Sequence, residues 1–310
     1  MTELYSVEPL IFASSYAGEG EGAIEIFCLD LDSGQLNFTS RVTGLDYPLF
    51  LNLSSDDRFL YSTQEPGEVS SEVAAYKISP TNGNLTFLNR RATKGRVACY
   101  IEVADSGKNL LIAHYGCGSV AVINIQKDGT LQNSPYLPMS LYSSADSSKR
   151  LNKPLAHCIT LSPDNRFAFA TDLGNDRILS YRVLPDRRTL LSSPISKFDV
   201  EAGSGPRHLL FSIDGRFLYI INEISNTITV AGYEAETGTL NEHQIITTLP
   251  EDFIGESHAG DIKLSMDGRF LYATNRGHDS IAVYCICKDG RLALTSIESS
   301  LGASHQSLAI

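Results

Sequence analysis

The sequence predicts an all-β protein, a β-propeller of four-stranded blades, from three observations: a repeated module, alternating strands within it, and glycine pairs at its turns. The module recurs about every fifty residues and consists of a short apolar strand, a Ser/Asp/Gly turn, a second strand and an Asn- or Gly-containing break. Five copies start at Leu49, Tyr100, Cys158, His208 and Asp261. Repeats of roughly 40 to 50 residues built from short strands are typical of propellers, because one such sheet cannot bury its faces alone.

Each module continues with two more strands. Third strands are predicted at 227–233 and 280–286, where apolar and polar residues alternate. The turns Thr237-Gly238 and Asp289-Gly290 then lead into a fourth strand, with glycine where a hairpin needs a positive φ. Four strands make one blade.

The two ends of the chain are offset from the repeat. Residues 10–16, 23–29 and 36–42 fit the second, third and fourth strands of a blade, and 304–310 fits a first strand. Pairing these ends would complete a split blade and remove exposed sheet edges. We therefore expect one domain over 1–310, with five whole modules and one blade shared between the termini.

Composition narrows the class of protein. The chain has 310 residues, 42% hydrophobic and 20% charged, and no stretch approaches the roughly 20 apolar residues that cross a bilayer. Its N-terminus lacks the pattern of a signal peptide, so a cytoplasmic location is expected. The net charge of −11 argues against nucleic-acid and membrane partners. An anionic ligand would need a local cluster of arginines, and the oligomeric state is left open.

The six cysteines lie mostly in predicted strands and lack the paired CxxC spacing of a zinc site. We expect buried thiols in a reducing compartment, with no disulfide framework, no metal and no cofactor. The connection 133–153 is long and rich in Ser and Pro, and it is interpreted either as a lid or as a mobile loop.

Aligning the modules on the residue that opens the second strand allows positions to be compared. Nine residues before this residue stand Leu49, Cys99, His157, Arg207 and Gly260. Seven residues after it stand Glu65, Tyr115, Leu173, Glu223 and Arg276. The two positions lie side by side in an antiparallel hairpin, so His157, Arg207, Glu223 and Arg276 are predicted to gather at one mouth of the central channel.

An imidazole, a carboxylate and two guanidinium groups together suit general acid/base catalysis beside an anion site. The alternative is structural: a hydrogen-bonded core histidine and arginines that cap turns. His114 and Asp172 are weaker substrate-binding candidates, because three other modules carry Gln or Asn at the same place and turn capping is the competing role. His208 is a third such candidate, although next to Arg207 it is expected to point to the opposite face of its strand.

Several of these stretches resemble one family over nearly the whole chain. They are AHYGCGSVAVINIQKDGTL, HCITLSPDNRFAFATDLGNDRI, GSGPRHLLFSIDGRFLYIINE, TLP followed by DF, and DGRFLYATNRGHDSIAVY. They are similar to the propeller lactonases, which group bacterial 6-phosphogluconolactonases with fungal carboxy-cis,cis-muconate cyclases. The resemblance implies seven blades and a site made by His157, Glu223, Arg207 and Arg276. The family's further module opening with Pro-Arg-Phe has no counterpart here, where Ser304-His305 stands in place of Pro-Arg.

The function that the resemblance implies is hydrolysis of a sugar lactone, most specifically 6-phosphogluconolactone to 6-phosphogluconate in the oxidative pentose phosphate pathway. In this hypothesis Glu223 or His157 activates water, one of Arg207 and Arg276 stabilises the oxyanion, and the other holds the phosphate. Two alternatives remain: a carboxymuconate cycloisomerase, and a non-enzymatic propeller that binds a protein partner.

Overall fold

The computed structural model describes residues 9–18, 20–67, 70–104, 107–133, 139–140, 153–184, 189–190, 193–304 and 306–309. Most of the predicted lid at 133–153 lies outside these residues. The protein is a β-propeller whose described strands form six antiparallel sheets. One 3₁₀ turn, Leu173–Asn175, is the single helical element of the described chain.

The first three sheets follow one another along the sequence. The first has the order β1 (Leu10–Ser15), β2 (Gly22–Leu29) and β3 (Leu36–Leu45). The second contains β4 (Leu51–Leu53), β5 (Phe59–Gln64), β6 (Glu72–Ile78) and β7 (Leu85–Ala92). The third contains β8 (Ala98–Ala104), β9 (Asn109–His114), β10 (Ser119–Asn124) and β11 (Met139–Ser140).

The remaining three sheets carry the candidate site. The fourth contains β12 (Ala156–Leu161), β13 (Phe167–Asp172), β14 (Arg177–Leu184), β15 (Thr189–Leu190) and β16 (Ser196–Asp199). The fifth contains β17 (Pro206–Phe211), β18 (Phe217–Asn222), β19 (Thr227–Glu234) and β20 (Thr239–Thr247). The sixth contains β21 (His258–Leu264), β22 (Phe270–Arg276), β23 (Ser280–Ile286) and β24 (Leu292–Ser299). The predicted third strands at 227–233 and 280–286 are confirmed.

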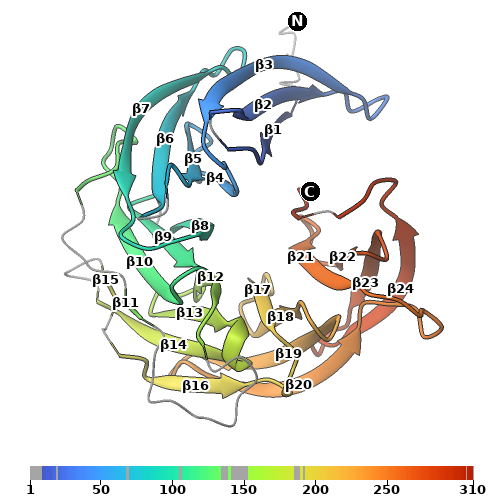
Figure 1. Ribbon diagram of the computed structural model, residues 1–310. Helices are drawn as coiled ribbons and strands as arrows, with labels where there is room; N and C mark the ends of the chain where they lie inside the picture. The colour runs from blue at the N-terminus through green and yellow to red at the C-terminus, as the bar shows by residue number, and fades with distance from the viewer. Residues whose placement is uncertain are drawn as a thin grey trace, which may run out of the picture. The chain divides into compact units, whose positions relative to one another are not determined.

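The chain divides into two compact units, 1–112 with 121–138, and 113–120 with 139–310. In the first unit, buried side chains pack between neighbouring sheets, and Tyr61, Ile101 and Ile112 lie in one such core. In the second unit Tyr219, Ile221, Ala273 and Tyr284 form the core between the fifth and sixth sheets. Within this unit β12, β17 and β21 pack side by side (Figure 1). The first strands of three blades are thereby neighbours.

The Ser/Asp turn of the module explains why the first hairpin repeats. Ser212 Oγ donates to Asp214 Oδ1 at 2.7 Å and accepts from Phe217 N at 3.0 Å. The same Asp214 oxygen accepts from Arg216 N at 3.1 Å, and Arg216 Nε pairs with Oδ2 at 2.7 Å. Such local side-chain to backbone bonds favour a turn over continued strand.

The predicted strand over 304–310 is not formed. Ser304 and residues 306–309 carry no strand, and the first sheet consists of β1, β2 and β3, so the predicted ladder between the termini is wrong for the described residues. Side-chain and backbone groups of 306–308 bind instead to β17, β21 and β22 of the second unit. Polar contacts, rather than a sheet edge, hold this segment.

The cysteines differ in part from the expectation. None of the six forms a disulfide, and only Cys99 and Cys158 are buried, whereas Cys285 and Cys287 are exposed. They lie on the last blade, where their strand ends in an exposed hairpin. No helix in the described part of the chain is long and apolar enough to span a membrane.

Candidate active site

A bulge at the same place in three first strands shapes the candidate site. The pairing register shifts between Ala156 and Ile159 in β12, between Pro206 and His208 in β17, and between Ala259 and Ile262 in β21. A bulge leaves residues outside the ladder and turns their side chains. His157, Arg207 and Asp261 lie within or beside these shifts.

Threonines of the second strands cap two of the bulges. Thr171 Oγ1 accepts from Cys158 N at 2.9 Å, and Thr274 Oγ1 accepts from Asp261 N at 2.8 Å. Each hydroxyl replaces a ladder partner for an amide that would otherwise be buried without one. Thr171 Oγ1 also donates to Arg207 O at 3.1 Å, which ties the fourth blade to the fifth.

The loops that enter β17 and β21 are held by residues in the left-handed conformation. Asp176, at φ 52°, accepts from Gly203 N at 2.9 Å and Gly205 N at 2.8 Å. Asn226, at φ 53°, donates to Ser257 O at 2.7 Å. Asp and Asn tolerate this conformation better than most residues. The chain therefore enters both site strands along a fixed path.

Glu223 lies between the two predicted arginines. Its Oε2 is 3.0 Å from Arg207 Nε and 3.2 Å from Arg276 Nη2. The three side chains are 19%, 6% and 15% exposed, which places them at the edge between interior and solvent. Two guanidinium groups facing one carboxylate leave an excess of one positive charge, which suits an anionic ligand.

Gln306 contacts both arginines from the C-terminal segment. Its Oε1 accepts from Arg207 Nη2 at 3.2 Å and from Arg276 Nη1 at 3.4 Å. Each arginine also binds a backbone oxygen: Arg207 donates to Gly260 O at 2.8 Å, and Arg276 donates to Ala259 O at 3.1 Å. The two guanidinium groups therefore converge on one oxygen position.

Two histidines stand next to the arginines. The rings of His157 and His208 are 5.2 Å apart, and the Tyr115 ring lies 5.6 Å from that of His157. Burial, and then the charges of Arg207 and His208, hold the pKa of His157 well below its usual range. Burial and the charge of Arg207 lower the pKa of His208 to about 4. Both imidazoles are therefore neutral near pH 7.

Asp261 is a buried carboxylate beside His208. His208 Nδ1 is 2.8 Å from Asp261 Oδ1, and Lys263 Nζ is 3.0 Å from Oδ2. Burial alone would raise the pKa of Asp261, but the hydrogen bond from His208 and the charge of Lys263 lower it. The carboxylate is therefore ionised.

The four principal candidates lie together in the second unit, as the repeat alignment predicts for their location. His208 lies with them rather than on the opposite face of its strand, because the bulge at 206–208 interrupts the alternation of side chains. Asp172 and His114 lie elsewhere. Asp172 is fully buried and pairs with Arg177 Nη2 at 2.9 Å, and His114, also fully buried, bonds Ser119 Oγ through Nδ1 at 3.1 Å.

Asp261 and Gln306 are the site residues that sequence reasoning missed. Asp261 stands eight residues before the second strand, the module position of His208, and comparing that position would have drawn attention to both. Gln306 lies in a segment expected to be a strand, so no pattern pointed to it. No group of three or more His, Cys, Asp and Glu side chains suited to a metal ion occurs among the described residues.

Comparison with known proteins gives consistent matches. The family model described as "Lactonase, 7-bladed beta-propeller" matches residues 10–309. The 6-phosphogluconolactonase of Bacillus subtilis is 32% identical over 292 residues, covering 94% of this chain and 82% of the relative. The solved structure of the Pseudomonas aeruginosa periplasmic gluconolactonase superposes with a TM-score of 0.85 at 30% identity, covering 95% of this chain and 84% of that one. A Lactobacillus plantarum protein superposes with a TM-score of 0.85 at 29% identity, covering 97% and 84%.

Proposed function

The chain belongs to the lactonase family of seven-bladed β-propellers, although its described strands form six sheets, and from this premise we propose that it hydrolyses 6-phosphogluconolactone to 6-phosphogluconate. The observation that carries the proposal is the convergence of Arg207 and Arg276 on Gln306 Oε1, 3.2 and 3.4 Å away. Guanidinium groups that share one acceptor form a site for an oxyanion or a phosphate oxygen. The Bacillus relative bears the name of this activity.

His157 is the proposed general base. Its pKa lies well below the usual range, so the ring is neutral near pH 7 and can take a proton from water as the water oxygen bonds to the lactone carbonyl carbon. Glu223 is the weaker choice, because Oε2 already pairs with both arginines. The ring C–O bond then breaks, and the leaving oxygen takes up a proton to give the open hydroxy acid.

Arg207 and Arg276 are assigned different roles in the reaction. Arg207 is more buried than Arg276 (6% against 15% exposed) and contacts His208, whose ring lies 5.2 Å from that of His157, which favours Arg207 as the group beside the reacting carbonyl. Preorganised donors at such a position stabilise the tetrahedral oxyanion. Arg276, with a more exposed side chain, is assigned to the phosphate. We place this activity in the oxidative pentose phosphate pathway and in the cytoplasm.

The test is an assay of acid release from freshly generated 6-phosphogluconolactone, measured above the spontaneous rate. Gluconolactone, the substrate named for the Pseudomonas neighbour, and a carboxylated muconolactone are assayed in parallel. Faster hydrolysis of the phosphorylated lactone, lost in His157→Asn, supports the proposal. Preference for gluconolactone would overturn the phosphate assignment, and opening of the muconolactone to the unsaturated muconate, without addition of water, would make the protein a cycloisomerase.

A further inference from the structure

A neutral side chain of the protein occupies the anion position between the two arginines. Gln306 Oε1 accepts from Arg207 Nη2 at 3.2 Å and from Arg276 Nη1 at 3.4 Å. Both bonds are longer than the roughly 2.7–2.9 Å of a charge-assisted bond from a guanidinium group to an anion. Glu223 pairs with both arginines and balances only one of their two charges. An anionic oxygen would therefore bind at this position more strongly than the amide oxygen does.

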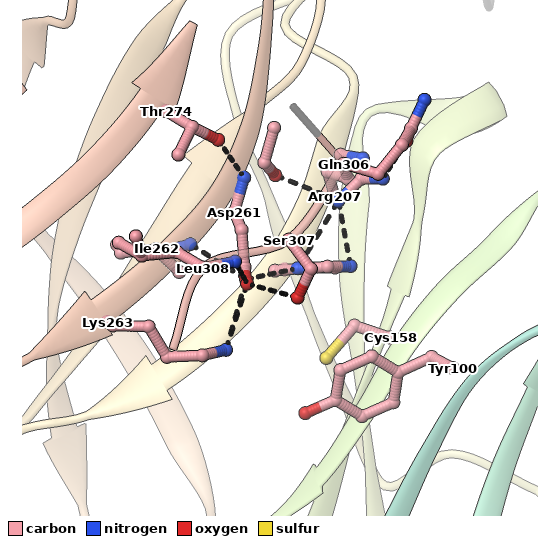
Figure 2. A network of polar contacts seen from close by, with 12 residues as sticks. Tyr100, Cys158, Arg207, Asp261, Ile262, Lys263, Thr274, Gln306, Ser307 and Leu308 are labelled. Carbon is pink, nitrogen blue, oxygen red and sulfur yellow. Dashed lines mark hydrogen bonds and ion pairs between the residues drawn. The ribbon is translucent and has the colours of Figure 1, made fainter. Parts of the chain in front are cut away.

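The residues that follow Gln306 are anchored to a buried carboxylate (Figure 2). Asp261 Oδ2 accepts from Ser307 Oγ and from Leu308 N, each at 2.9 Å, and it lies 3.0 Å from Lys263 Nζ. Asp261 is 1% exposed. Withdrawing donors from a buried charge costs more than breaking the same bonds in water, because no water replaces them. The backbone at 307–308 is therefore held firmly next to the anion position.

A second anchor precedes Gln306. Ser304 N donates to Asp279 Oδ1 at 2.8 Å, and the same oxygen accepts from Gly277 N at 3.2 Å. The chain is thus fixed on both sides of Gln306, whereas Gln306 itself is exposed. Exposed side chains change rotamer within nanoseconds. The amide can therefore leave the arginines while both anchors stay in place.

We infer that Gln306 is a built-in competitor for the anion site, and that Ser307 and Asp261 are positioning residues that hold it there. Tethering the amide next to the arginines gives it a high effective concentration, so it fills the site in the absence of an anion. A phosphate oxygen, which carries charge, displaces the side chain and leaves the anchors intact. The inference rests on the proposed function for the identity of the substrate, but not for the binding of an anion.

Gln306→Ala tests the competition, with inorganic phosphate as the ligand and isothermal titration calorimetry as the measurement. A competitor reduces the apparent affinity by the fraction of molecules in which the site is open. Removing the amide should lower the Kd for phosphate about threefold or more, as expected if the amide fills the site for about two-thirds of the time. Gln35→Ala, at an exposed glutamine before β3, is the matched control and should keep the wild-type Kd. A raised or unchanged Kd in Gln306→Ala would overturn the inference.

Ser307→Ala tests the anchor. Loss of the hydroxyl loosens the tether, so the Kd for phosphate should fall about twofold in the wild-type background. In the Gln306→Ala background the same substitution should change nothing, because the anchor acts only through the amide. Ser304→Ala keeps the backbone N–H that binds Asp279 and is the control, with no change expected. No effect in the wild type, or an equal effect in both backgrounds, would overturn the positioning role.

Phosphate binding and lactone hydrolysis separate this inference from the proposed function. If the variants behave as expected with phosphate but the wild type hydrolyses no lactone, the proposed function fails and the inference stands. If the wild type hydrolyses 6-phosphogluconolactone but Gln306→Ala binds phosphate no more tightly, the inference fails and the proposed function stands. In the active enzyme, Gln306→Ala should lower KM for this lactone about threefold and change kcat by less than about twofold, because the amide competes with binding and not with the chemical step.

Discussion

Replacing Arg207 by alanine should affect both turnover and stability, because this arginine is buried and holds several groups at once. The substitution removes the ion pair with Glu223 and the contact with the His208 ring, and it leaves Gly260 O without its side-chain donor. A buried acceptor left unpaired costs about 1–3 kcal/mol, so the free energy of unfolding should fall by about that amount. The midpoint of thermal unfolding should fall by several degrees.

The expected loss of activity comes from the transition state. A charge-assisted hydrogen bond to the oxyanion contributes about 1.5–3 kcal/mol, which corresponds to a roughly tenfold to hundredfold fall in kcat/KM. Arg276→Ala is the comparison, since its side chain is more exposed. It should show a similar loss in kcat/KM with a smaller change in unfolding temperature. Initial rates of acid release and thermal unfolding followed by circular dichroism measure both quantities. If Arg207→Ala keeps the wild-type rate and unfolding temperature, the assignment of Arg207 to the site is wrong.

Three further outcomes are expected. Glu223→Gln should keep or lower KM, because both guanidinium groups lose their shared counter-charge. It should also lower kcat about tenfold, because the two groups lose their orienting partner. An unchanged kcat would contradict this role. Gln306→Glu places a carboxylate against both arginines and should raise KM about tenfold, whereas Gln306→Ala should not raise it. Burial lowers the pKa of His114 from 6.5 to about 4, so between these pH values the unfolded chain binds a proton at His114 and the folded chain does not. The free energy of unfolding should therefore fall as pH drops from about 6.5 to 4, with His114 contributing up to about 3 kcal/mol of the loss. In urea unfolding at pH 7 and 4.5, His114→Gln should lose less stability between the two pH values than the wild type does, by the contribution of His114.

The repeat predicted the fold, and it grouped the four principal candidate residues, for one physical reason. In an antiparallel hairpin, the start of the first strand and the end of the second are neighbours in every blade. His157, Arg207 and Arg276 differ from their equivalents in all other modules at these two places, and Glu223 shares its residue type only with Glu65. Comparing the modules therefore predicts which residues lie close together in space although they are far apart in the sequence.

Strict alternation of side chains along a strand fails at the register shifts. Strict alternation assigns His208 to the far side of β17, but the register shift at 206–208 brings it beside Arg207. Asp261 escapes notice for the same reason, because it lies within the shift in β21. The C-terminal segment fails differently, since its place in the repeat suggests a first strand, while its polar groups bind Asp261, Arg207 and Arg276. Local pattern carries no information about such long-range competition.

The scaffold and the chemistry of the site are separable. In the second blade Thr63 Oγ1 accepts from Phe50 N at 2.9 Å, the same contact that Thr171 makes with Cys158 and Thr274 with Asp261. The threonine cap is therefore a property of the repeat, and in the second blade the capped residue, Phe50, is apolar. In the fourth blade the same hydroxyl also donates to Arg207 O, so the cap of one blade fixes the backbone of the next. A site can arise on this scaffold when a few side chains change at these capped positions. The backbone there is already held by groups that take no part in the chemistry, so the new side chains are oriented from the start.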